Sequence, residues 1–189
     1  DARKSFGLDP EKKTVVFVGG SLGARTVNES ILRHLDLVEQ AKDIQFIWQT
    51  GKYYNASINK EIEGKKPGNL LVTDFISDMG AAYKAADLVI SRAGASSISE
   101  FCLIGKPVVL VPSPNVAEDH QTKNAMALVN KDAAIYVKDA DAPETLLKLA
   151  IDTVKDGNKL ATLSANIKKL GLKNSADVIA DEVIKLARR

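Results

Sequence analysis

Two turns rich in small residues are the segments of this sequence that could carry chemistry. Residues 19–25 read Gly-Gly-Ser-Leu-Gly-Ala-Arg, and residues 91–100 read Ser-Arg-Ala-Gly-Ala-Ser-Ser-Ile-Ser-Glu. Each turn follows a short apolar run and precedes a segment with helical periodicity. Glycine lets backbone N–H groups approach a ligand closely, and the N-terminus of the following helix favours negative charge. The two turns therefore indicate a site for an anionic phosphate or diphosphate.

Each turn also has a purely structural explanation. Residues 19–25 could form a tight connection that binds nothing. Ser97 and Glu100 match a capping box, in which the carboxylate reaches back to the backbone at the start of the helix. In the binding alternative, Gly94 and Ala95 admit a diphosphate and Glu100 accepts hydrogen bonds from a ribose diol. We favour binding because the two turns are expected on neighbouring strands of one sheet.

Other phosphate-binding motifs fit the same residues poorly. A dinucleotide fingerprint needs glycines at positions 19, 21 and 24, where this chain has Gly19, Ser21 and Ala24. It also needs an acid near the end of the second strand, which reads Trp-Gln-Thr over residues 48–50. A Walker A loop fails because the Gly-Lys pair at residues 51–52 is followed by tyrosine and lacks the upstream glycine. NAD is therefore disfavoured.

A serine hydrolase is the second alternative. Residues 19–23 match the G-x-S-x-G nucleophile elbow, and Asp87 and His120 follow Ser21 in the order that hydrolases use. That elbow requires several strands of the sheet before it, whereas here the elbow strand is the first. The hydrolase hypothesis therefore ranks below nucleotide binding.

A third segment with polar side chains spans residues 112–124. Long polar loops are more often functional than short connectors are. Gln121 and Asn124 can each donate and accept hydrogen bonds, which suits recognition of sugar hydroxyls. A surface loop with an N-cap at Asp119 is an equally good explanation when this loop is considered alone.

Several other residues have sufficient structural explanations. His34 is expected on the ordinary surface of the first helix. The Asp-Ala-Asp sequence at residues 139–141 resembles a metal motif, but Asp141 with Glu144 forms a helix-capping pattern, so no metal site is predicted. Cys102 lies in an apolar helical stretch and is expected in the core.

Composition excludes several classes of protein. The 189 residues include 26 basic and 24 acidic side chains, which gives no reason to expect a nucleic-acid-binding surface. The single cysteine excludes an intramolecular disulfide and a cysteine-based zinc site, and is typical of a reducing cytosol. No apolar run is long enough to span a bilayer, and no signal-peptide pattern opens the chain. The polar start at Asp1 indicates a linker cut from a longer protein.

The elements that position these turns alternate along the chain. Apolar runs predict strands at residues 14–18, 44–48, 70–72, 88–90, 107–111 and 134–137. Helical patterns occupy residues 26–38, 54–63, 79–86, about 97–104 and about 120–130. From Asp141 onward the chain is wholly helical, and the last helix is predicted at residues 174–189.

Strands separated by helices require crossover connections, which give a parallel sheet covered on both faces. We therefore predict an α/β fold with a Rossmann-like, six-stranded parallel sheet. The expected organisation is a linker remnant at residues 1–12, a ligand-binding domain at 13–172 and a C-terminal helix at 173–189. Ligands of such sheets bind at the carboxyl ends of the strands, where the turns described above are expected.

Four motifs, taken together, resemble the C-terminal domain of the MurG family of glycosyltransferases. They are residues 19–25, residues 75–79, residues 92–100, and residues 120–125 with His-Gln followed by Asn-Ala. This family transfers N-acetylglucosamine from UDP-N-acetylglucosamine to lipid I, which gives lipid II in peptidoglycan synthesis. The resemblance implies the GT-B architecture, in which two Rossmann-like domains face each other across a cleft. It also implies a peripheral protein on the cytoplasmic face of the bacterial cell membrane, serving cell-wall biogenesis, cell shape and division.

The resemblance assigns roles by position. Ser21 would contact the diphosphate, Ile76 would read the uracil through its backbone, and Glu100 would hold the ribose hydroxyls. Gln121 would contact the sugar hydroxyls, with His120 beside it. The donor-binding residues implied are Ser21, Ile76, Ala95, Ser96, Ser97, Ile98, Ser99, Glu100 and Gln121. Further candidates are Gly20, Arg25, Arg92, Gly94, His120 and Asn124.

The chemistry implied is an inverting displacement at the anomeric carbon. The acceptor 4-hydroxyl attacks while UDP departs, stabilised by amides and helix dipoles without a metal or cofactor. The catalytic base, the lipid I site and the membrane contact belong to a domain expected before Asp1. The chain is thus expected to bind the donor without turnover. Leu22 and His120 depart from glutamines common in the family, which concerns the fine contacts to the donor and hardly its identity. Another GT-B enzyme, such as a UDP-N-acetylglucosamine epimerase, is an alternative because such enzymes share the sheet and the helix N-termini that bind the ligand.

Overall fold

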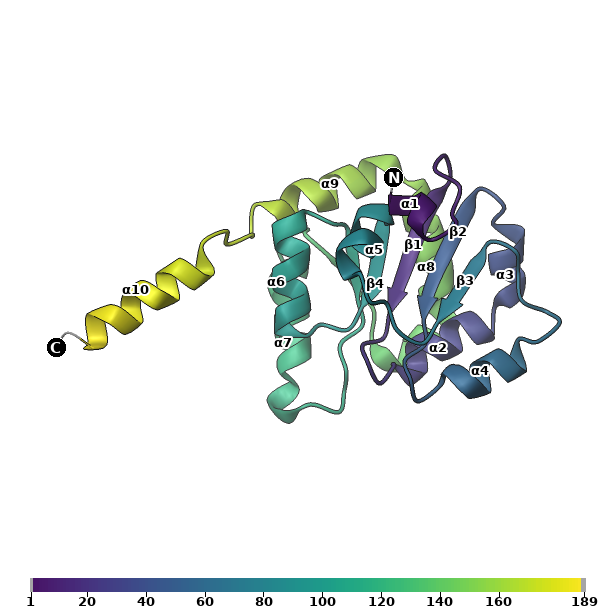
Figure 1. The fold of residues 1–189 in the computed structure, drawn as a ribbon, viewed down its shortest axis with the longest axis horizontal. Coiled ribbons are helices and arrows are strands. Elements are labelled where there is room, and N and C mark those ends of the chain that lie inside the picture. The colour runs from purple at the N-terminus through teal and green to yellow at the C-terminus, as the bar shows by residue number, and fades with distance from the viewer. Residues whose placement is uncertain (1, 188–189) are drawn as a thin grey trace.

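The computed structural model describes residues 2–187, without the side chains of residues 175 and 176. Its centre is a six-stranded parallel sheet in the order β3-β2-β1-β4-β5-β6 (Figure 1). The strands are β1 (Lys13–Val18), β2 (Ile44–Gln49), β3 (Leu70–Thr73), β4 (Leu88–Ser91), β5 (Val108–Leu110) and β6 (Ile135–Tyr136). The predicted sheet is confirmed, and each strand coincides with its predicted run within two residues.

Helices connect the strands and cover the sheet. They are α1 (Ala2–Ser5), α2 (Arg25–Leu32), α3 (Leu35–Gln40), α4 (Asn55–Glu61), α5 (Met79–Ala85), α6 (Ala95–Ile104), α7 (His120–Val129), α8 (Ala142–Lys155), α9 (Gly157–Lys168) and α10 (Ser175–Ala187). Two 3₁₀ turns, η1 (Ala117–Asp119) and η2 (Asp139–Asp141), precede α7 and α8. Gly105 ends α6 in the left-handed conformation, which glycine adopts without steric cost.

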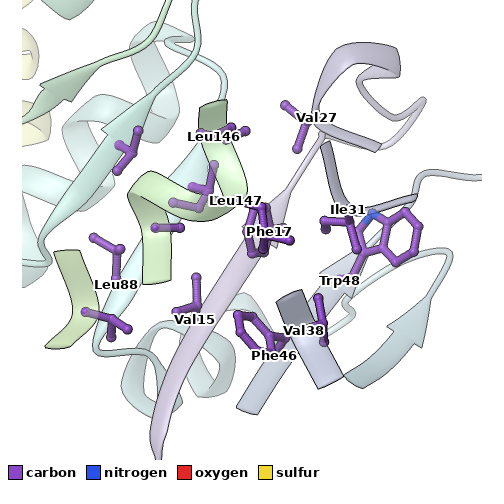
Figure 2. Packing of buried hydrophobic residues seen from close by; sticks show 14 of the residues in the cluster. Val15, Phe17, Val27, Ile31, Val38, Phe46, Trp48, Leu88, Leu146 and Leu147 are labelled. Carbon is purple, nitrogen blue, oxygen red and sulfur yellow. The ribbon is translucent and has the colours of Figure 1, made fainter. Parts of the chain in front are cut away.

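The two faces of the sheet bury separate apolar clusters, because successive side chains of a strand point to opposite faces. Val15 and Phe17 of β1 pack with residues of α2, α3 and α8 on one face (Figure 2). Val16 lies in the second cluster, which side chains of α5, α6 and α7 complete. The near-continuous apolar runs in the sequence reflect this burial on both sides.

The strand order reverses between β1 and β4. Chain connections from β1 lead outward to β2 and β3, whereas β4 pairs with the other side of β1 and leads outward to β5 and β6. The loops that follow β1 and β4 therefore lie side by side at the carboxyl edge of the sheet. This switch point is where doubly wound sheets bind ligands.

The prediction of one helix over residues 26–38 is wrong. The helix ends at Leu32, and a second begins at Leu35 after a turn at Arg33 and His34. Both side chains in the turn face Glu144 on α8, with the Arg33 guanidinium in an ion pair with its carboxylate. His34 is partly buried, so its prediction as an ordinary surface residue is also wrong.

The two ends of the described chain differ in how they pack. In the segment predicted to be a linker, α1 lies against α5, and Arg3 donates hydrogen bonds to Asp87 and to the carbonyl of Pro10. In contrast, α10 projects away from the sheet (Figure 1) and exposes large apolar side chains. The predicted ends at residues 1 and 189 lie outside the described residues. No helix within residues 2–187 combines the length and hydropathy needed to cross a bilayer.

Replacement of Leu147 by alanine tests the packing of α8 on the sheet. Leu147 is 1% exposed and lies in the cluster with Phe17. We expect Leu147→Ala to lower the free energy of unfolding by about 2–5 kcal/mol, because it leaves a cavity in the core. Urea unfolding monitored by circular dichroism measures this. Leu186→Ala on α10, where the side chain is 65% exposed, is the control and should change stability little.

Candidate functional site

Glycines lock the loop after β1 against the loop after β2. Gly23 and Gly51 both have positive φ angles, of 90° and 83°. A Cβ atom on Gly51 would overlap the backbone of Gly23, and one on Gly23 would lie 2.8 Å from the Tyr54 ring. The Lys52 N–H donates to the carbonyl of Ser21 at 3.1 Å. These glycines are therefore required for contact between two loops.

The buried side-chain amide of Asn28 holds these two loops in position relative to each other. Asn28 of α2 accepts a hydrogen bond from the Trp48 indole and donates one to the carbonyl of Thr50, both at 2.9 Å. All three residues are buried. The first turn of α2 is thus tied to the end of β2. Gly20, in contrast, has a φ of 83° and open space around its Cα, so this part of the loop faces outward.

The N-terminus of α6 presents free backbone donors. The helix begins at Ala95, after Gly94, and no side chain caps it. Intrahelical bonding starts with Ile98, whose N–H donates to the carbonyl of Gly94 at 3.0 Å. The N–H groups of Ala95, Ser96 and Ser97 have no partner among the described residues. With Gly94 also open to its surroundings, this helix end can receive an anion.

The structural alternative for residues 97–100, a capping box, does not form. Because α6 starts at Ala95, Glu100 lies too far along the helix to bond to its first turn. Its Oε2 atom accepts a hydrogen bond of 3.1 Å from the hydroxyl of Tyr83 on α5. Glu100 is nevertheless exposed. Its carboxylate is available at the surface, one turn beyond the free N–H groups.

A partly buried ion pair supports the segment that leads into α6. The Arg92 guanidinium pairs with the Asp139 carboxylate and donates to the carbonyl of Val111 at 3.1 Å. Asp139 also accepts from the hydroxyl of Thr26 at 2.6 Å. The guanidinium of Arg92 is thus bonded to other residues of the protein, so Arg92 supports the loop after β4. The capping box predicted for Asp141 and Glu144 is wrong, because no side chain caps α8 and Glu144 pairs with Arg33.

Gln121 and Asn124 of α7 connect the loop after β5 to the loop after β4. Gln121 accepts hydrogen bonds through Oε1 from the N–H groups of Ala93 (3.2 Å) and Ser113 (2.9 Å). Asn124 donates to the carbonyl of Ala93 at 3.2 Å. The Gln121 amide nitrogen has no partner among residues 2–187 and is free to donate. Asp119 occupies the predicted N-cap position of α7 but makes no capping bond.

The loop after β3 offers its backbone. The side chain of Ile76 is buried at 3% exposure, and its N–H and C=O groups make no hydrogen bond with the described residues. Phe75 beside it is exposed, and the Lys52 ammonium lies 5.7 Å from the centre of its ring. A planar base recognised here would therefore meet main-chain donors and acceptors.

The remaining predicted residues contribute differently. Ile98 packs against the second core cluster, and the Ser99 hydroxyl donates to the carbonyl of Ala95 within the helix. Arg25 lies 3.8 Å from Glu29, and one ring nitrogen of His120 lies 2.9 Å from the carbonyl of Ala117. Within residues 2–187, no group of three His, Cys, Asp or Glu side chains is placed to hold a metal. Cys102 is in the core as predicted, and burial raises the pKa of its thiol.

The geometry rules out the hydrolase triad. Ser21 follows the carboxyl end of β1, but Asp87 precedes β4 at the opposite edge of the sheet. There, the Asp87 carboxylate accepts from the Thr14 N–H and from Arg3. The six residues of β1 separate the two edges by roughly 20 Å. Asp87 therefore cannot orient a base beside Ser21.

Tyr83, Thr26 and Asp139 are site residues that sequence reasoning missed. Each acts through a partner far along the chain, from Tyr83 to Glu100 and from Asp139 to Arg92 and Thr26. The spacing of the sequence offers no signal for such pairs. Asp139 lies in the Asp-Ala-Asp sequence that resembles a metal motif, but its partners in the structure are Arg92 and Thr26.

Comparison with known proteins identifies the family. The family described as the glycosyltransferase family 28 C-terminal domain matches residues 14–181. The chain belongs to this family. The match covers the whole sheet and extends through α8 and α9 into α10, so all the loops described above lie inside the family 28 domain.

The relatives of this family 28 domain are longer proteins. The chain is 63% identical over 190 residues to the UDP-N-acetylglucosamine–N-acetylmuramyl-(pentapeptide) pyrophosphoryl-undecaprenol N-acetylglucosamine transferase of Bacteroides fragilis, covering all of this chain and 50% of that protein. The crystal structure of Acinetobacter baumannii MurG matches with a TM-score of 0.79 and 29% identity, over 97% of this chain and 53% of that one.

A more distant structure shares the fold. It is a putative UDP-N-acetylglucosamine 2-epimerase from Listeria monocytogenes, with a TM-score of 0.70 and 12% identity, over 95% of this chain and 46% of that one. At this identity the likeness concerns the fold alone. The chain spans about half the length of the curated relatives it matches.

Substitution of Gly51 tests the contact between the first two loops. Gly51→Ala places a Cβ atom against the backbone of Gly23 and strains a positive φ. Gly64 has a similar φ, of 72°, but a Cβ atom there would meet nothing within 4 Å. Gly64→Ala therefore measures the cost of the backbone strain without any overlap. We expect Gly51→Ala to lose about 1–3 kcal/mol more stability than Gly64→Ala, because overpacking adds to the strain. Equal losses in urea unfolding would contradict the assigned contact.

Proposed function

We propose that this chain is the donor-binding domain of an enzyme that transfers N-acetylglucosamine from UDP-N-acetylglucosamine to lipid I in peptidoglycan synthesis. Membership of the family 28 domain and the identity to the Bacteroides fragilis transferase support the reaction. The acceptor site and the catalytic base would lie in the part of the relatives that this chain does not span. A place at the cytoplasmic face of the cell membrane, with membrane contact through that other part, belongs to the same proposal.

The observation that carries the proposal is the free N-terminus of α6 with Glu100 one turn along it. The unpaired N–H groups of residues 95–97 suit the oxygens of a diphosphate, and the helix dipole adds to their attraction. The carboxylate of Glu100 suits the two hydroxyls of a ribose, which both donate hydrogen bonds. Spacing of about one helical turn matches adjacent phosphate and ribose groups of one nucleotide.

The other loops extend this arrangement toward the two ends of the donor. The free main-chain groups of Ile76 would read the uracil ring. On the opposite side, the free amide nitrogen of Gln121 would donate to a sugar hydroxyl, while its oxygen holds the loops after β4 and β5 together. Ser21 and Gly20, on the exposed part of the first loop, would approach the diphosphate from the neighbouring strand.

The site supports departure of UDP in the transfer reaction. When the acceptor 4-hydroxyl attacks the anomeric carbon, the bond to the diphosphate breaks and negative charge grows on the leaving oxygen. Backbone N–H groups fixed at the helix end stabilise this charge without having to reorganise. The family 28 domain would thus supply donor binding and leaving-group stabilisation, and the remainder of the enzyme would supply the acceptor and its deprotonation.

Replacement of Glu100 tests the assignment of the ribose contact. Hydrogen bonds to a charged group contribute about 1.5–3 kcal/mol, so we expect Glu100→Ala to weaken UDP-N-acetylglucosamine binding by roughly 10- to 100-fold. Isothermal titration calorimetry measures the change. Glu61→Ala, an exposed helical glutamate on α4, is the matched control and should bind as the unsubstituted chain does. Equal affinities for Glu100→Ala and the control would refute the contact.

Competition among UDP, UDP-glucose and UDP-N-acetylglucosamine separates the proposed donor site from that of another enzyme of the same fold with a different sugar preference. The 189-residue chain should bind UDP-N-acetylglucosamine but form no lipid II from lipid I, because the acceptor half is outside it. The full-length Bacteroides fragilis relative serves as the positive control for transfer. Transfer by the chain alone would refute this division of labour, and a preference for UDP-glucose over UDP-N-acetylglucosamine would refute the donor.

A further inference from the structure

We propose that Tyr83 is a positioning residue that holds the Glu100 carboxylate in the orientation needed to bind the ribose hydroxyls of the nucleotide. The inference rests on the proposed function and goes beyond it, since Tyr83 lies behind the site and acts through Glu100. Its basis is the contact between the two residues and the way in which the tyrosine ring is fixed.

The Tyr83 ring is held by the core. The residue is 7% exposed and belongs to the second apolar cluster. Its ring meets the ring of Phe101 edge-on, with centroids 5.4 Å apart and planes at 76°. Phe101 is the neighbour of Glu100 on α6, so the packing of one ring on another brings the hydroxyl to the carboxylate. The hydroxyl then donates to Oε2 at 3.1 Å.

The direction of this hydrogen bond is fixed by charge. Burial, together with the negative charge of Glu100, raises the pKa of Tyr83, so the hydroxyl keeps its proton at neutral pH. The carboxylate is therefore the acceptor, and Oε1 remains available to a ligand. A glutamate side chain that is free in solvent loses rotamer entropy when a ligand orders it, and the tyrosine contact reduces that loss in advance.

Helix α5 links the two parts of a nucleoside site. Asp78 caps the helix by accepting from the N–H of Ala81 at 2.8 Å, directly after the loop that contains Ile76. Tyr83 lies one turn further along the same helix. A single short helix thus positions the backbone proposed to read the base and the carboxylate proposed to read the ribose.

The test compares UDP with 2′-deoxy-UDP by isothermal titration calorimetry. Tyr83→Phe removes the hydroxyl and keeps the ring packing. We expect it to weaken UDP binding by about 3- to 10-fold, the effect of one hydrogen bond, and to weaken 2′-deoxy-UDP binding much less. In the Glu100→Ala background, Tyr83→Phe should have no further effect. Tyr53→Phe, on an exposed tyrosine, is the matched control.

A second variant breaks the same contact from the exposed side. Glu100→Asp keeps the charge but withdraws the carboxylate from the Tyr83 hydroxyl and from the ribose alike, so it should lose UDP affinity selectively, and Tyr83→Phe added to it should cause no further loss. Glu100→Asp changes no core side chain, so its selective loss reports the ribose contact independently of the packing of Tyr83. A merely structural role for Tyr83 would weaken both nucleotides equally.

The outcomes separate this inference from the function beneath it. If the unsubstituted chain does not bind UDP, the proposed function fails and this inference fails with it. If it binds UDP, but both variants bind the two nucleotides as the controls do or lose affinity equally for both, the positioning role is overturned while donor binding stands.

Discussion

The reversal of strand order between β1 and β4 is the constraint on which this site depends. It sets the first turns of α2 and α6 side by side, with their N–H groups at one edge of the sheet. Neither helix is capped by a side chain, although unpaired N–H groups at a helix end are costly when they are buried. The surrounding contacts form a frame that fixes both helix ends and leaves the start of α6 open, while Ala24 and Thr26 at the start of α2 are buried.

That frame uses most of the polar side chains near the site. Arg92 is neutralised by Asp139, and the oxygen of Gln121 holds two loops together. The glycines divide in a similar way. Gly23 and Gly51 are needed because two loops touch, whereas Gly20 faces open space and a Cβ atom on Gly94 would meet only the Ser97 hydroxyl, at 4.0 Å. The resemblance implies ligand contact for Arg92 and Gln121, and in the structure both side chains also hold the site together.

The strands and most of the helices could be predicted from the sequence because they depend on local patterns. Apolar runs of strand length and helical periodicity each involve only residues that are close together in the chain. The errors share a different cause. Two segments match a capping box in the sequence, and in both the glutamate has a partner on another helix or turn, Tyr83 for Glu100 and Arg33 for Glu144. The turn between α2 and α3 faces the same Glu144, 111 residues from Arg33. Tertiary contacts of this kind override the local preference for helix capping, and they cannot be predicted from the spacing of residues along the chain.

The framing also determines how the site can meet a charged ligand. Because the guanidinium of Arg92 is committed to Asp139, the attraction for a diphosphate at α6 must come mainly from main-chain N–H groups and the helix dipole. Such dipoles are held by the helix itself and need no rearrangement when charge develops. They also require that the ligand come close, which explains the small side chains of Ala95, Ser96 and Ser97 at the helix start. The small residues let the proposed diphosphate approach the N–H groups of α6, and these groups supply the attraction that the paired Arg92 does not.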